Sequence, residues 1–87
     1  MTLSNDWIAP KNLNDGDHVR IRATRYLSER LLGRTGRVNF RGCHEGDEYL
    51  HYEGFPEDFV RVDLDEPEPD GAYVVAVPVG DLSIASV

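Results

Sequence analysis

Seven arginines lie between positions 20 and 41 of this 87-residue chain, and they are its most concentrated source of binding chemistry. The same segment carries one acid, Glu29, so its formal charge is +6. A guanidinium makes planar, bidentate contacts with carboxylates or phosphates, which a lysine cannot make. Two interpretations follow. The arginines form a basic face for an anionic partner, or they pair with the acidic remainder of the chain, in contacts that each stabilise little.

The rest of the chain is acidic. Residues 1–19 carry a charge of −2 and residues 42–87 a charge of −11, which brings the total to −7. This total opposes indiscriminate binding to nucleic acids or membranes. We therefore expect a molecule with a basic face and an acidic face, either of which could dock a partner.

Soft metal ligands are few. Cys43, His44 and His51 form no Cys-x-x-Cys or His-x-x-x-His pair, whereas a metal site needs three or four converging ligands. No third group orients a Cys–His pair for nucleophilic attack. Carboxylate pairs such as Glu57-Asp58 indicate a solvated acidic face, because a domain this small offers no deep cleft for glycosidase chemistry. The sequence thus predicts no metal, no cofactor and no enzyme activity.

A Gly-x-x-Gly segment at residues 33–36 superficially resembles a phosphate-binding loop. It lacks the Lys-Ser/Thr pair of a P-loop, and it leads into a strand rather than a helix. We interpret it as a turn in which glycine provides unusual backbone geometry. The predicted turn glycines are Gly16, Gly33, Gly36 and Gly71.

Six aromatic residues are candidates for an interface. If residues 48–53 form a strand with Leu50 and Tyr52 inward, then Tyr49 and His51 face outward, and Phe59 is expected on the outside too. Core or loop packing explains most of these rings, but an exposed Tyr/Phe/Arg patch would suit an interface or the stacking of single-stranded nucleic acid. The six are Tyr26, Tyr49, Tyr52, Phe55, Phe59 and Tyr73.

The elements that position these residues are mostly strands, since apolar residues alternate with a period of two. A short helix or ordered insert is expected around residues 25–32, and a loosely packed arm over residues 1–13, pinned by Trp7 and Ile8. Turns every eight to twelve residues indicate one small all-β barrel or sandwich over residues 14–87. The predicted strands are residues 18–24, 36–41, 48–53, 59–64, 72–79 and, for a short closing strand, 83–87.

Three segments resemble a known architecture. Residues 16–21 (GDHVRI) and 32–38 (LGRTGRV) resemble the Gly-Asp and Gly-x-x-Gly turns of KOW-type and related SH3-like small barrels. Residues 77–82 (VPVGDL) are similar to the close of such barrels, where a one-turn 3₁₀ segment precedes the last strand. The longer insert after the first strand looks more like the nitrile hydratase β subunit, and the photosystem I E subunit is a similar barrel. The resemblance implies an SH3-like antiparallel barrel of five or six strands with an accessory or docking role.

The sequence therefore predicts a non-catalytic, cytoplasmic binding module, an adaptor or accessory subunit that docks on another protein. A KOW-like RNA- or DNA-binding domain is the first alternative, and an accessory domain of a redox or hydratase enzyme the second. No apolar run is long enough to span a membrane, and no targeting segment is visible. The predicted partner-binding residues are Arg20, Arg22, Arg34, Arg37, Arg41 and Tyr49.

Overall fold

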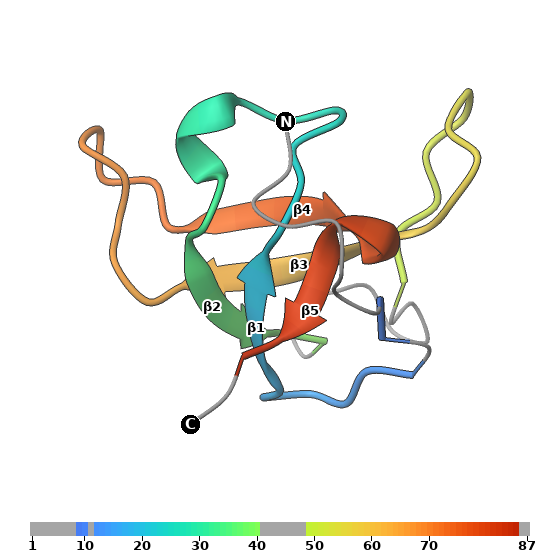
Figure 1. The fold of residues 1–87 in the computed structure, drawn as a ribbon, viewed down its shortest axis with the longest axis horizontal. Coiled ribbons are helices and arrows are strands. Elements are labelled where there is room, and N and C mark those ends of the chain that lie inside the picture. The colour runs from blue at the N-terminus through green and yellow to red at the C-terminus, as the bar shows by residue number, and fades with distance from the viewer. Residues whose placement is uncertain (1–8, 11, 41–48, 86–87) are drawn as a thin grey trace.

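The computed structural model describes residues 9–10, 12–40 and 49–85, which form an all-β domain with five antiparallel strands (Figure 1). This confirms the predicted fold class. Two single 3₁₀ turns complete the described elements, η1 (Glu29–Leu31) and η2 (Val79–Asp81). No helix in these described stretches is long and apolar enough to cross a membrane. The strands are β1 (His18–Ile21), β2 (Thr35–Val38), β3 (Phe59–Leu64), β4 (Val74–Pro78) and β5 (Leu82–Ile84).

The strands form one sheet in the order β4-β3-β2-β1-β5. In Figure 1, β3 and β4 run across the view while β1 and β5 run steeply across that direction, so the sheet is strongly bent. The turn η2 leads directly from β4 into β5, as expected for the one-turn segment before a last strand. Bending brings one face of every strand onto a shared apolar core. Its buried members are Leu13, Val19, Ile21, Leu31, Val38, Val60, Val62, Leu64, Val77 and Leu82.

The period-two pattern located most strands. The prediction for residues 59–64 matches β3 at both ends, and β4 occupies the middle of predicted residues 72–79. The prediction of a strand over residues 48–53 is wrong for its described part, where only Leu50 pairs, in a bridge with Phe59. That segment makes a tight turn instead, because Gly54 adopts a φ of +89°.

The insert after β1 is ordered but hardly helical. Within residues 25–32, predicted as a short helix or an ordered insert, the single turn η1 is the helical part. Its flanking residues Ser28 and Leu32 are both extended, with ψ angles of 137° and 127°. A two-turn helix has too few internal hydrogen bonds to persist alone, so packing of Leu31 into the core decides the local conformation.

Three of the four predicted turn glycines have a positive φ, namely Gly16, Gly33 and Gly71. The prediction for Gly36 is wrong, because this residue lies inside β2 opposite Leu64. A Cβ at position 36 would lie 2.4 Å from the carbonyl oxygen of Asp63. Glycine is required there by the close approach of β3, and backbone handedness plays no part.

The residues before β1 contribute to the core. Leu13, at the end of the predicted arm, is buried, and its backbone N–H donates to the Tyr49 hydroxyl at 3.3 Å. Asn14 closes the turn into β1 through its backbone N–H, which donates to Asp17 Oδ2 at 2.8 Å. Trp7 and Ile8, the predicted anchors of the arm, lie outside the described residues.

Candidate docking surface

Four aromatic rings form one contact network at the surface, here named the aromatic cluster: Tyr26, Tyr52, Phe55 and Phe59. Phe55 contacts Tyr26 and Phe59 edge to face, with ring centroids 5.0 and 5.2 Å apart, and Tyr52 contacts Phe59 in the same way at 5.0 Å. Edge-to-face pairs at these distances stabilise beyond simple burial. Phe59 is buried, but Tyr26, Tyr52 and Phe55 keep 37–43% of their surface exposed.

Tyr52 and Phe55 lie in a loop whose two ends are paired as in a β-hairpin. Leu50 and Phe59 exchange two backbone hydrogen bonds of 2.7 Å, which fix the base of the loop. At its tip, the N–H of Phe55 donates to the carbonyl of Tyr52 at 3.2 Å, and Gly54 has a φ of +89°. This is the geometry of a type II turn, which favours glycine at the third position. Tyr52 and Phe55 are thereby held at the two ends of one turn.

Tyr26 is positioned from the other side by Arg25. The guanidinium carbon of Arg25 lies 5.2 Å from the centroid of the Tyr26 ring. Its Nε donates to Asp81, a fully buried carboxylate in η2, and its Nη2 donates to Glu57. These contacts connect the loop after β1, the loop before β3 and the turn η2, so three segments distant in sequence meet beside the rings.

The environment of Arg25 favours the charged form of its guanidinium group. Burial lowers the pKa of Arg25, but hydrogen bonds to Asp81 and Glu57 outweigh that effect and raise the pKa above its ordinary value. Glu57 also accepts a hydrogen bond from the backbone N–H of Gly80 at 2.8 Å. A Cβ at position 80 would lie 2.7 Å from Glu57 Oε2, so glycine permits the carboxylate to approach.

A hollow of about 530 Å³ adjoins this junction on the other side of Glu57. Apolar groups from Pro10, Tyr49 and Val79 line it, together with the carboxylates of Glu57 and Asp58. Tyr49 is the aromatic residue of this lining, and no member of the aromatic cluster belongs to it.

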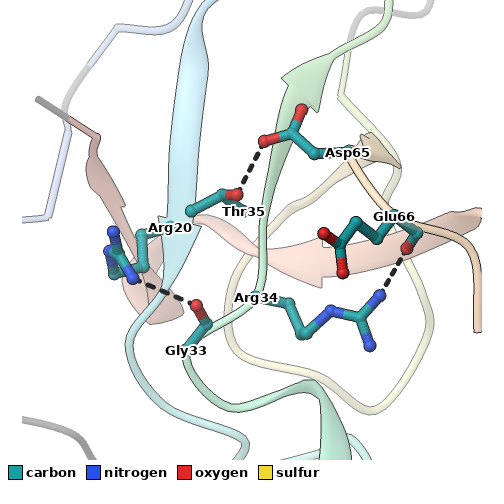
Figure 2. Close-up of a pocket in the computed structure, with 6 residues that line it drawn as sticks. All are labelled: Arg20, Gly33, Arg34, Thr35, Asp65 and Glu66. Carbon is teal, nitrogen blue, oxygen red and sulfur yellow. Dashed lines mark hydrogen bonds between the residues drawn. The ribbon is translucent and has the colours of Figure 1, made fainter. Parts of the chain in front are cut away.

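The arginines predicted to bind a partner are largely used within the chain. We name Arg20, Arg22, Arg34 and Arg37 the arginine face. Figure 2 shows Arg20 and Arg34 on opposite sides of Gly33, around a second hollow of about 380 Å³. Arg20 Nη1 donates to the carbonyl of Gly33 at 3.2 Å, and Arg34 Nη2 donates to the carbonyl of Glu66. Their guanidinium groups point apart, so they do not converge on one anion.

The remaining arginines differ in their exposure and in their hydrogen-bond partners. Arg37 is exposed, and its Nη1 donates to the Gly16 carbonyl at 3.1 Å. Arg22 is half-buried, and its buried Nε–H donates to no acceptor among the described residues. Arg30 and Arg34 lie 3.7 and 3.6 Å from the oxygens of buried Glu68. Arg41 lies outside the described residues.

Tyr49 is not the outward residue that alternation predicted. It is half-buried against the core, its hydroxyl accepts the Leu13 N–H, and its ring lies 5.5 Å from that of Phe40. Tyr52, predicted inward, is 43% exposed, whereas Phe59, predicted outside, is 5% exposed. Alternation failed here because residues 49–53 leave the sheet after the bridge at Leu50, and because the loops cover the outer side of β3.

Polar contacts between β1, β2 and the loop after β3 form a third group. Asp65 Oδ2 accepts a hydrogen bond from the Thr35 hydroxyl at 2.6 Å and lies 2.7 Å from His18 Nε2. The hydrogen bonds from Thr35 and His18 hold the pKa of Asp65 below its ordinary value. The carboxylate sits between the other two groups, so His18 does not contact the hydroxyl as a general base would.

Cys43 and His44, the candidate metal ligands, lie outside the described residues, and His51 lies 3.2 Å from Asp58. In the stretches that the structure describes, no three His, Cys, Asp or Glu side chains converge on a point as metal ligands would.

Two important residues were missed by the analysis of the sequence. Arg25 is the first residue of the insert predicted over residues 25–32, and Asp81 lies in the predicted one-turn 3₁₀ segment, so neither was predicted as a partner-binding residue. A weak signal existed, since an acid directly after glycine in an apolar stretch needs a partner if it is buried. Nothing in the sequence indicates that the partner lies 56 positions earlier.

Comparison of the chain with models of known protein families, with curated proteins and with solved structures gave no match. The assignment of function therefore depends on the geometry of these surfaces.

Proposed function

We propose that this chain is a non-catalytic protein-binding module, and that its partner docks on the aromatic cluster. The observation that carries the proposal is the exposure of three rings, each 37–43% accessible, in one network held by the Arg25–Asp81 ion pair. Tyrosine and other aromatic residues dominate the energetics of protein interfaces because they bury large areas at little entropic cost.

The hydrogen bonds of the arginines argue against the arginine face as the interface. Arg20, Arg34 and Arg37 each donate to a backbone carbonyl of the chain itself, so docking through them would have to replace existing hydrogen bonds. Docking on the aromatic cluster would not have to replace such hydrogen bonds. Its exposed ring surface is already ordered, and covering it with a partner gains the hydrophobic free energy of burial.

The test is quantitative affinity capture from the native host with four immobilised proteins. These are the wild type, the double variant Tyr52→Ser/Phe55→Ser, the variant Tyr73→Ser and the double variant Arg20→Ser/Arg37→Ser. Tyr73 is the matched control, because it is 54% exposed and lies outside the cluster. Circular dichroism and thermal unfolding confirm that each variant is folded.

We expect a protein captured by the wild type, Tyr73→Ser and the arginine variant to be lost with the Tyr52/Phe55 variant. Equal capture by all four proteins would disprove docking on the cluster. Loss with the arginine variant alone would favour the arginine face. A low-salt titration with labelled RNA and DNA, at up to about 50 µM protein, tests the nucleic-acid alternative, and binding that depends on Arg37 would replace the present proposal.

A further inference from the structure

The sheet ends at β4 and β5, and each of these strands has one neighbouring strand among the described residues. The hydrogen bonds at the two ends of the β3–β4 ladder show which backbone groups of β4 face β3. The N–H of Leu64 donates to the carbonyl of Tyr73 at 2.6 Å, and the N–H of Val79 donates to the carbonyl of Asp58 at 3.1 Å. Because backbone groups alternate along an antiparallel ladder, the residues between direct theirs away from β3. These residues are Val74, Ala76 and Pro78.

The outer edge of β4 is open to pairing. Within the described part of the chain, no residue pairs with the outward backbone groups of Val74 or Ala76, and Pro78 has no N–H. Val74 is 44% exposed, and Tyr73, directly before the strand, is 54% exposed. Charged side chains commonly protect such an edge from pairing. β4 carries none, so its edge can accept another strand.

The edge of β5 is less suited to pairing. This strand has only the three residues Leu82–Ile84. Its ladder with β1 directs the backbone groups of Leu82 and Ile84 outward. The Leu82 N–H already donates to the Val79 carbonyl at the end of η2. Among the described edges, β4 is therefore the one that presents two outward residues in register.

The outward groups of β4 are complementary to those of a second, antiparallel β4. If a two-fold axis passes at Val75, then Val74 of each copy lies opposite Ala76 of the other. Each of these pairs exchanges both of its N–H···O=C hydrogen bonds. Residues 72–77 (AYVVAV) also have no charge and no proline, which is the composition of segments that pair with copies of themselves.

The charges act in two opposing ways. On the outer face, Arg61 lies opposite Ala76, and Asp63 lies opposite Val74. With Val75 at the axis, Arg61 of one copy therefore shares a row with Asp63 of the other, across two short side chains. The net charge of −7 on each copy, to which the acidic loop before β4 contributes, opposes the approach. We therefore expect a weak association that added salt strengthens.

We propose that β4 is a self-association edge, at which two copies of the chain pair antiparallel around Val75 and join their sheets. A second copy suits this edge because its own β4 is already extended, so pairing does not have to order a flexible segment. The assembly closes as a dimer, since each copy uses the edge once. The inference goes beyond the proposed function, because it involves no residue of the aromatic cluster.

The test combines sedimentation equilibrium with nuclear magnetic resonance spectra of the ¹⁵N-labelled full chain, over a dilution series from about 1 mM to about 20 µM. We expect the average mass to rise with concentration from that of one chain toward that of two. The amide signals of Val74, Val75 and Ala76 should shift over the same range, and added salt should strengthen the association.

Three variants locate the contact. Val74→Lys brings two like charges together diagonally across the axis and should weaken the association about fivefold or more. The single chain should stay folded, because the new ammonium group lies opposite Asp63 on β3. Val74→Thr keeps an uncharged, β-branched side chain and should retain the association. Ile84→Lys is the matched control, because it makes the same charge change at a 56% exposed residue of β5 and should leave the association unchanged.

A mass of one chain at every concentration would overturn the inference, as would equal association of Val74→Lys and Ile84→Lys. Circular dichroism verifies that the variants fold, and if Val74→Lys does not, the signals that shift in the wild type decide. Shifts centred on Tyr52 and Phe55 would place self-association on the aromatic cluster and refute pairing through β4. The outcome is separate from the capture experiment, in which Val74→Lys should retain every protein that the wild type captures.

Discussion

The arginine face and the aromatic cluster exchange the roles that their residue types suggest. Arginines are expected at the surface to meet a partner, yet Arg20, Arg34 and Arg37 bind carbonyls of their own chain and help to fix its loops. Aromatic rings are expected inside, yet three of the four rings of the cluster remain exposed. The comparison teaches that an arginine side chain stabilises its own chain where backbone carbonyls lie within its reach. Aromatic rings, in contrast, stay exposed where a small core has no room for them.

The largest expected effect separates the buried ring from the exposed ones. Phe59→Ala removes a ring that is 5% exposed and should lower the free energy of unfolding by about 3–4 kcal/mol. Tyr52→Ala removes a ring that is 43% exposed and should cost about 1 kcal/mol. Urea denaturation of both variants measures the difference. Equal losses would mean that all the rings are core and that none is reserved for a partner.

The next effect concerns the framework under the arginine face. Gly36→Ala places a Cβ 2.4 Å from the Asp63 carbonyl oxygen and 2.7 Å from Val62 Cγ1, so β2 and β3 must separate. We expect a loss of about 3 kcal/mol. Gly54→Ala, in the loop of the aromatic cluster, meets no atom within 4 Å and only has to adopt a φ of +89°, which costs about 1 kcal/mol.

Thermal or urea unfolding of the two glycine variants tests this ranking. If Gly54→Ala proved the more damaging, the loop and not the strand pair would be the rigid part of the molecule.

A smaller effect distinguishes the two kinds of arginine. Arg25→Met leaves the buried Asp81 carboxylate without its guanidinium partner and should cost about 2 kcal/mol, less than for a wholly buried pair because Arg25 is 43% exposed. Arg37→Met, in the arginine face, should cost less than about 0.5 kcal/mol. Arg25→Met should also broaden the Tyr26 ring resonances. A loss for Arg37→Met as large as that for Arg25→Met would contradict the distinction.

The smallest effect is a dependence on pH. The pKa of Asp65 is lowered in the folded state by Thr35 and His18, so the unfolded chain takes up a proton first as the pH falls. Its contribution to stability is fully present above its ordinary pKa, near 4, and is lost as the pH falls through the lowered value. Asp65→Asn should therefore have a flatter acid limb than the wild type in urea midpoints measured from pH 7 to pH 2.5. Glu66→Gln is the neighbouring control, and an unchanged slope for Asp65→Asn would refute the assignment.

The strands were predictable wherever a buried face repeats every second residue. Val60, Val62 and Leu64 identified β3 to the residue, because each inward side chain faces the same core. The method failed at Tyr49, Tyr52 and Phe59, where burial depends on loops that fold over the outer face of the sheet. Alternation states which side of a strand a residue is on, and it cannot state whether another segment covers that side.

By itself, the sequence determined that the chain is all-β, that its strands fall near residues 18–21, 59–64 and 74–78, and that Gly16, Gly33 and Gly71 make turns. These features arise from local backbone sterics and from periodic burial, which neighbouring residues encode. Only the tertiary structure decided that Arg25 meets Asp81, that four rings share one surface and that the arginine face is bound to its own backbone. The contacts of Arg25 and of the arginine face join residues 13 to 56 positions apart, and their geometry exists only once the bent sheet has brought the loops together.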